Sequence, residues 1–188
     1  LHAMIDANER IKYDTRNRNL LKTRNALLLK FLYLTAARRS EAANLKWEDL
    51  QQDGEFQVVI LQQTKSGEPQ KLKLRRELFE ELECWNETLK TNQIECEWVF
   101  PSLSFRTLGG KMSGKGVNDV VSKLGSAIGL KISAHYLRHT AITLALELGE
   151  PLQKVQSYAR HASANTTIRY FHDQQFLEKN PTDRLPMI

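Results

Sequence analysis

Apolar residues recur at helical spacing over most of this 188-residue chain, and only one short region departs from that period. Such spacing is typical of amphipathic helices that share a core. The predicted helical stretches are Thr23–Thr35, Arg39–Lys46, Glu77–Thr91, Gly116–Ile128, Ser133–Gly149 and Leu152–Tyr158. No repeat or Pro/Gly-rich linker interrupts them, so we expect one mainly α domain with a sizeable core.

The exception is a β-prone region near the first third of the chain. Residues Phe56 to Leu61 are apolar and rich in β-branched side chains, and Lys71 to Leu74 alternate between polar and apolar. The segment Thr64 to Pro69 between them has the composition of a turn. The sequence therefore predicts a β-hairpin, and the expected fold class is mainly α with a small antiparallel β-sheet (α+β).

Composition excludes several classes of protein. Charged residues make up 26% of the chain and apolar residues 41%, and no apolar run is long enough to span a bilayer. We expect no membrane partner. The two cysteines, Cys84 and Cys96, have no neighbouring ligands at metal-binding spacing, and so few cysteines are typical of reduced thiols inside a cell. We expect a cytoplasmic protein.

Charge is segregated along the chain. Lysine and arginine number 27 against 22 acidic residues, a net charge of +5. Basic residues gather between Arg10 and Arg24 and again between Arg106 and Lys131, and an acidic stretch from Glu77 to Glu87 separates them. This pattern indicates either a face that contacts phosphates or an ordinary solvated surface.

Several short segments contain residue types that carry chemistry. His135 and His139 stand four residues apart, as a helical zinc pair would, but no third ligand is evident in the sequence. The other candidates are Thr35-Ala36-Ala37-Arg38-Arg39-Ser40-Glu41, the turn that contains Lys65, His135-Tyr136-Leu137-Arg138-His139-Thr140, and His161 followed nine residues later by Tyr170.

The order and spacing of these segments resemble the catalytic domain of the tyrosine recombinases, the phage-integrase family, from about Leu20 to His172. The first segment is similar to the family's Thr-Gly-x-Arg-x-Ser-Glu, and its His-x-x-Arg-His-Thr box is matched letter for letter at His135 to Thr140. The resemblance implies a DNA strand transferase, a site-specific recombinase or integrase, with double-stranded DNA as its partner.

The resemblance also assigns roles to individual residues. Arg38 and Arg138 would clamp the phosphate, His135 and His161 would be the two histidines, and Tyr170 would be the nucleophile of a 3′-phosphotyrosyl intermediate. Glu41 lies one helical turn after Arg38 and would orient a cationic or imidazole group. Two arginines can supply the charge that a metal would otherwise provide, so we expect no metal and no organic cofactor.

The catalytic lysine is less securely placed. In the family it lies in a β-hairpin between the two arginine motifs, and Lys65 occupies such a turn, but Lys71 and Lys73 are alternatives. Two positions depart from the family pattern: Ala36 replaces a glycine before the first arginine, and Arg160 replaces the glycine before the second histidine. Glycine there permits backbone conformations that arginine resists, although Arg160 could add a phosphate contact.

The resemblance divides the chain into a basic N-terminal segment or interdomain linker (1–19), a catalytic domain (20–172) and a C-terminal tail (173–188) that could dock on a neighbouring protomer. It implies a homo-oligomer, a tetramer, on DNA. Family members usually carry a further N-terminal DNA-binding domain, so we expect a fragment. The alternatives are a type IB topoisomerase-like or telomere-resolving enzyme, and a DNA-binding module without activity.

Overall fold

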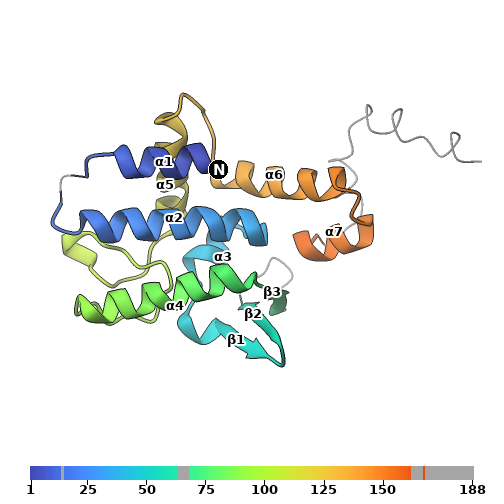
Figure 1. Ribbon diagram of the computed structural model, residues 1–188, viewed down its shortest axis with the longest axis horizontal. Coiled ribbons are helices and arrows are strands. Elements are labelled where there is room, and N and C mark those ends of the chain that lie inside the picture. Colours follow the sequence, from blue (N-terminus) through green and yellow to red (C-terminus); the bar gives the residue numbers. More distant parts are fainter. Residues whose placement is uncertain (14, 63–67, 162–166, 168–188) are drawn as a thin grey trace, which may run out of the picture.

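A computed structural model of the chain describes residues 1–13, 15–62, 68–161 and 167. Helices dominate it, and a small sheet lies at one side (Figure 1). The elements are α1 (His2–Arg10), α2 (Arg18–Thr35), α3 (Arg39–Ala43), the short helix η1 (Trp47–Asp49), β1 (Leu50–Asp53), β2 (Phe56–Leu61), β3 (Gln70–Lys73), α4 (Arg76–Thr91), η2 (Phe105–Thr107), α5 (Gly114–Ser126), α6 (Ala134–Glu147) and α7 (Leu152–Ala159). The predicted mainly α fold with a small antiparallel sheet is confirmed.

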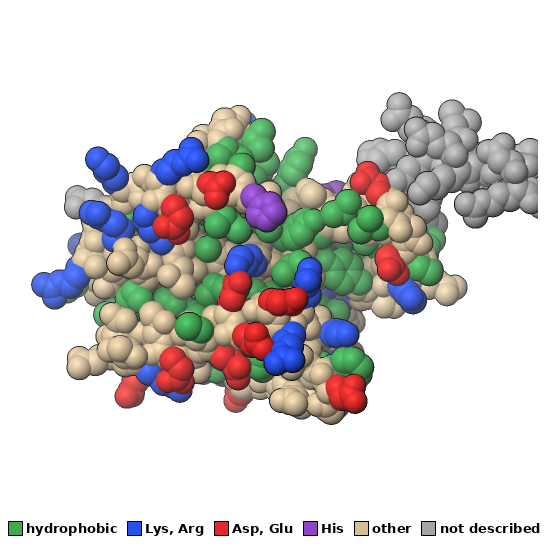
Figure 2. All heavy atoms as spheres, in the orientation of Figure 1, with side chains coloured by type: hydrophobic (Ala, Val, Ile, Leu, Met, Phe, Trp, Pro, Cys, Tyr) green, Lys and Arg blue, Asp and Glu red, His purple; other side chains and the backbone are tan. Residues whose placement is uncertain are grey.

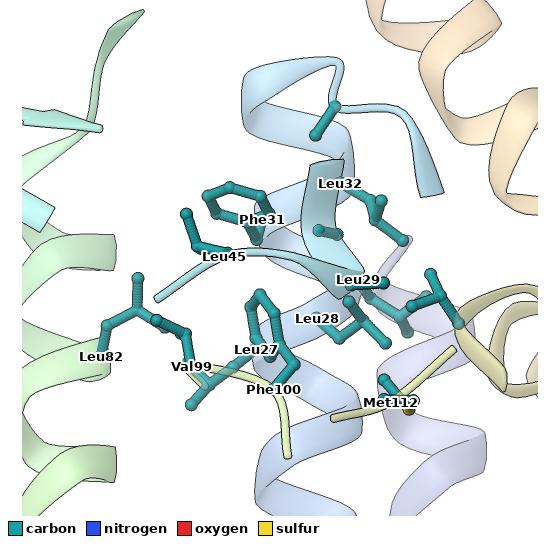
Figure 3. Packing of buried hydrophobic residues seen from close by; sticks show 14 of the residues in the cluster. Leu27, Leu28, Leu29, Phe31, Leu32, Leu45, Leu82, Val99, Phe100 and Met112 are labelled. Atoms are coloured by element: carbon teal, nitrogen blue, oxygen red, sulfur yellow. The ribbon is translucent and has the colours of Figure 1, made fainter. Parts of the chain in front are cut away.

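Helix α2 is the centre of the molecule, because α1, α4 and α6 all pack against it (Figure 1). Leu28, Leu29, Phe31 and Leu32 of this helix are completely buried. Figure 3 shows them surrounded by apolar side chains from other elements, and the ring of Phe31 lies 5.5 Å from that of Phe100. Burial on several sides explains why this stretch is the most apolar of the chain.

The sheet has three strands in the order β1-β2-β3, all antiparallel. The predicted hairpin corresponds to β2 and β3, whereas β1 was not predicted. The two-residue turn Gly54-Glu55, with Gly54 in a left-handed conformation at φ 58°, connects β1 to β2. Glycine at the first position of a two-residue loop is typical of a β-hairpin. The sequence contained this signal, but the polar composition of β1 concealed the strand.

The N-terminal segment, expected as a basic linker or its junction, contributes a helix to the fold. Helix α1 packs against α2 and α5, and Met4 is 2% exposed. The amide of Asn8, also buried, donates to the carbonyl of Lys22 at 2.7 Å and accepts from the hydroxyl of Tyr13 at 2.9 Å. Residues 2–10 are therefore part of the folded unit; the proposed domain boundaries stay a prediction.

A second, smaller core lies where α6 and α7 pack together. Its buried members are Ala36, Ala141, Ile142, Leu146, Val155 and Ala159. Ala36 belongs to the turn after α2, so this cluster attaches the last two helices to the end of the central helix. The predicted boundaries at Gly149 and Pro151 are confirmed: Gly149 follows α6 at φ 84°, and α7 begins directly after Pro151.

The charged surface matches the segregation seen in the sequence only in part. Figure 2 shows basic side chains at the end of the molecule where α1 finishes and α2 begins. Over α4 the acidic side chains are mixed with basic ones, and Glu81 is paired with Lys30 at 2.6 Å. None of the helices in the described part of the chain is both long and apolar enough to cross a membrane.

Replacing Gln93 with glycine is expected to raise the free energy of unfolding by about 1 kcal/mol, because left-handed backbone is strained for a residue with a Cβ. Gln93 follows α4 at φ 58° with its side chain exposed, and the amide of Ile94 donates to the carbonyl of Leu89 at 2.9 Å. Glycine fits this helix-ending motif best. Urea unfolding of both proteins measures the difference; a destabilised variant would contradict the assigned backbone.

Candidate active site

The turn between α2 and α3 places the first predicted arginine. Thr35 ends α2, and Ala36 then adopts a left-handed conformation at φ 46° while completely buried. This conformation explains why the resembling family has glycine at that position. The turn reverses the chain so that Arg38 caps the N-terminus of α3 and Glu41 faces inward, 2% exposed.

Glu41 holds Arg38 at two points. Its Oε1 accepts from Nη1 of Arg38 at 2.6 Å, and its Oε2 accepts from the backbone amide of Arg38 at 2.7 Å. Burial by itself would raise the pKa of Glu41, but Arg160 and Arg38 outweigh that effect and keep the pKa below its ordinary value. Glu41 therefore remains a carboxylate, which fixes the direction of the Arg38 guanidinium.

Arg138 reaches the same turn from α6. It is 3% exposed, and its Nη1 donates to the carbonyl of Ala36 at 2.5 Å while its Nη2 donates to the carbonyl of Ala159. These two acceptors belong to segments that are far apart in the sequence. The second predicted arginine is thus held by backbone carbonyls, and such contacts set its orientation more strictly than a solvated side chain allows.

The three histidines surround these arginines. Nε2 of His135 and Nε2 of His139 are 2.8 Å apart, and Nδ1 of His161 lies 2.9 Å from the hydroxyl of Thr167. Burial and the positive charges of Arg138 and Arg38 lower the pKa of His135 and lower that of His161 to about 4. The His161 ring is consequently neutral at neutral pH, and the lowered pKa of His135 favours the neutral form, which can accept a proton.

In a histidine NMR titration we expect His161 to stay neutral until the pH approaches 4, and the pKa of His135 and His139 to lie below the ordinary 6.5. The unfolded chain takes up these protons at a higher pH than the folded protein does. The free energy of unfolding therefore decreases as the pH falls from 6.5 towards 4. Ring-carbon shifts recorded between pH 7.5 and 4 give each value. A His161 that titrates at or above pH 6.5 would contradict this arrangement.

An open cavity of about 490 Å³ lies in front of these groups. Arg38, His135 and Arg138 line it, together with small residues of the α2–α3 turn and the start of α6. Positive charge at the wall of a concave site attracts anions. The cavity can accommodate a phosphodiester against both guanidinium groups.

The structure therefore brings together Arg38, Glu41, His135, Arg138 and His161 from three separate segments. The other two predicted site residues, Lys65 and Tyr170, lie outside the described residues. A zinc site at His135 and His139 would need a third ligand. In the part of the chain that the structure describes, no group of three His, Cys, Asp or Glu residues is placed to hold a metal.

Two residues in this cluster were not assigned a site role from the sequence. His139 contacts His135, and Arg160 forms an ion pair with Glu41 at 3.0 Å. The helical spacing of four residues between the histidines was a usable signal for the first. For Arg160 the only signal was its departure from the family's glycine.

The alternative lysines occupy the outer face of the sheet. Nζ of Lys71 pairs with Asp53 at 2.8 Å, and Nζ of Lys73 lies 4.6 Å from the centre of the Phe56 ring. Both side chains are exposed and already engaged on β3. This placement agrees with a solvated outer face, as the alternation of this strand predicts.

Arginines and a histidine line one cavity on a mainly helical fold, and this set of side chains suits an anionic ligand. The sequence profile of the phage integrase family matches residues 5–176, and this chain belongs to the phage integrase family. The chain is 31% identical over 173 residues to a tyrosine recombinase of Synechococcus elongatus, covering 90% of this chain and 53% of that protein. It is 33% identical to the tyrosine recombinase XerA of Pyrococcus horikoshii, covering 78% and 50%.

Solved structures show the same fold. The chain is similar to the XerH site-specific recombinase in a post-cleavage complex with a palindromic difH substrate, with a TM-score of 0.77, 23% identity and coverage of 98% of this chain and 51% of that one. It is also similar to the XerA recombinase, with a TM-score of 0.71, 22% identity and coverage of 100% and 61%. The chain spans about half the length of the curated relatives it matches.

Proposed function

We propose that this chain is the catalytic domain of a site-specific DNA recombinase that cleaves and rejoins DNA strands through a 3′-phosphotyrosyl intermediate at Tyr170. The observation that carries the proposal is the convergence of Arg38 and Arg138 on one cavity, each held by internal acceptors. Charge that accumulates on the nonbridging phosphate oxygens during cleavage is stabilised by such fixed donors.

The proposed reaction is reversible without a co-reactant. The hydroxyl oxygen of Tyr170 attacks the phosphorus, the bond from phosphorus to the 5′-oxygen breaks, and His135 accepts the tyrosine proton. Lys65 donates a proton to the departing 5′-oxygen as general acid. A 5′-hydroxyl of another strand then attacks the phosphotyrosine, so the tyrosine recovers its proton and the lysine is reprotonated in the reverse transfer.

The proposed partner is double-stranded DNA, bound by a homo-oligomer that reaches a tetramer during strand exchange. Two similar proteins support this partner: the XerH recombinase is bound to difH DNA, and lambda integrase is a dimer bound to a core site. The basic side chains where α2 begins provide sequence-independent contacts to phosphates.

A covalent trapping experiment tests this function. The chain is incubated, in EDTA, with a library of nicked duplexes that lose the 5′-hydroxyl fragment after cleavage. We expect a protein–DNA adduct that resists denaturant, and its bound strands identify the target site. Chelation should change little, because arginines supply the positive charge.

The matched control is Arg38→Ala, which removes one fixed donor and should slow adduct formation by about 10²- to 10³-fold. Addition of an intact second duplex then separates a recombinase from a topoisomerase-like enzyme, since only the former joins strands between duplexes. The proposal would be overturned if adduct formation required magnesium, or if no duplex in the library gave an adduct.

A further inference from the structure

Arg160 stands in a backbone position that normally belongs to glycine. It follows α7 in a left-handed conformation at φ 54° and ψ 45°. Its amide donates to the carbonyl of Ser157 at 3.0 Å, and the amide of His161 donates to that of Gln156 at 3.1 Å. These two bonds form the motif that ends helices with a left-handed residue. The motif sets the backbone position of His161.

The guanidinium of Arg160 is buried, and both of its terminal nitrogens donate hydrogen bonds inside the protein. The side chain is 1% exposed. Its Nη1 donates to the carbonyls of Thr35 at 3.1 Å and Tyr158 at 2.9 Å. Its Nη2 donates to the carbonyl of Ala36 at 2.8 Å and to Oε2 of Glu41 at 3.0 Å. Nε has no hydrogen-bond partner among the described residues. From this position the group does not reach a DNA phosphate, so the contact considered from the sequence does not fit.

The same bonds connect Arg160 to both arginines of the cavity. Glu41 bonds Arg160 through Oε2 and Arg38 through Oε1, and the carbonyl of Arg160 accepts from Nη2 of Arg38 at 3.0 Å. The carbonyl of Ala36 accepts from Arg160 and also from Arg138. One buried guanidinium therefore shares an acceptor with each of the two groups that face the cavity.

We propose that Arg160 is a positioning residue that holds Glu41, Arg38 and Arg138 in the geometry needed for phosphate cleavage. This inference rests on the proposed function. Without the guanidinium, Glu41 keeps only one cationic partner, and the end of α7 loses its hydrogen bonds from Arg160 to the carbonyls of Thr35 and Ala36 at the end of α2. A planar fork with several donors can hold these divergent acceptors at once, whereas an ammonium group cannot reproduce that arrangement.

Arg160→Gly is the decisive variant, because glycine accepts the left-handed backbone and only the side chain is lost. We expect the single-turnover rate of adduct formation to fall about 10- to 100-fold, with DNA affinity changed by less than about 3-fold because no phosphate contact is removed. Arg160→Lys should show the same loss. The matched control is Gln93→Gly, the same replacement at an exposed left-handed residue away from the cavity; its rate should equal that of the parent.

Chemical rescue separates positioning from general stability. Methylguanidinium at millimolar concentration should enter the space left in Arg160→Gly, with its substituted nitrogen in place of Nε. It should raise the variant's rate of adduct formation several-fold. It should not accelerate the parent protein or Gln93→Gly. A Glu41→Gln change should cost less in Arg160→Gly than in the parent, because both residues act through one contact. A parental rate in Arg160→Gly, or a loss without rescue or coupling, would overturn the proposal.

The proposal has a readout that does not depend on cleavage. In ¹⁵N spectra of arginine side chains, the guanidinium groups of Arg38 and Arg138 should give sharp, restricted signals in the parent and broadened signals in Arg160→Gly. If the parent forms no adduct but the signals change in this way, the proposed function fails and the positioning role stands. If the parent forms an adduct and the signals and rate of the variant are unchanged, only the positioning role fails.

Discussion

Tyr170→Phe is expected to abolish the covalent adduct completely while DNA binding is retained. The phenol oxygen is the proposed nucleophile, and phenylalanine lacks it but keeps the ring. Tyr158 is a poor substitute. The hydroxyl of Tyr158 donates to the carbonyls of Tyr33 and Leu34, and burial raises the pKa of Tyr158 to about 12.

The experiment compares Tyr170→Phe with Tyr158→Phe on a nicked duplex. A denaturing gel measures the adduct, and a gel shift at low salt measures binding. Tyr158→Phe should keep its adduct, although loss of the buried hydroxyl bonds will lower its stability. An adduct that persists in Tyr170→Phe would move the nucleophile to Tyr158 or to Tyr136, which is 60% exposed on α6.

Lys65→Ala is expected to reduce cleavage of ordinary DNA by about 10²- to 10⁴-fold, the usual contribution of a general acid. An alkoxide leaves poorly without a proton. A thiolate, whose conjugate acid has a pKa of about 8.5, leaves readily. On a duplex with sulfur in place of the bridging 5′-oxygen, the variant should therefore recover most of the parental rate, and single-turnover rates on both substrates provide the measurement.

Lys71→Ala and Lys73→Ala are the matched controls. Their side chains are engaged with Asp53 and with the ring of Phe56 on the exposed face of β3, so both variants should cleave ordinary DNA at nearly the parental rate. If sulfur rescue were seen for one of these variants and not for Lys65→Ala, the role of general acid would pass to that lysine.

Local pattern was sufficient for most of the helical framework. The periodicity of Thr23 to Thr35 predicts the last two thirds of α2, and Gly149 and Pro151 mark the boundary between α6 and α7 as observed. These features depend on side chains within a few residues of one another, so the sequence contains them. The motifs around Arg38 and Arg138 similarly predicted candidate site residues, because a motif is defined by the spacing of its residues along the chain.

The local sequence pattern was insufficient to predict the elements that depend on contacts with another part of the chain. The start of α2 at Arg18 and the strand β1 carry polar residues, and α1 lies in a segment whose charge suggested a solvated linker. Each is stabilised by another part of the chain: β1 by its ladder with β2, and α1 by burial of Met4 against α2. A propensity of a few tenths of a kcal/mol per residue is easily outweighed by such packing.

By itself, the sequence determined most of the helices and identified Arg38, Arg138, His135 and His161 as candidates. Only the tertiary structure decided what those groups bond. Arg138 and Arg160 both donate to the carbonyl of Ala36, over 102 and 124 residues of chain respectively. An arginine can donate to a phosphate, a carboxylate or a carbonyl. Which acceptor it meets depends on burial and on the backbone that folding brings beside it, and the spacing of residues along the chain does not record either.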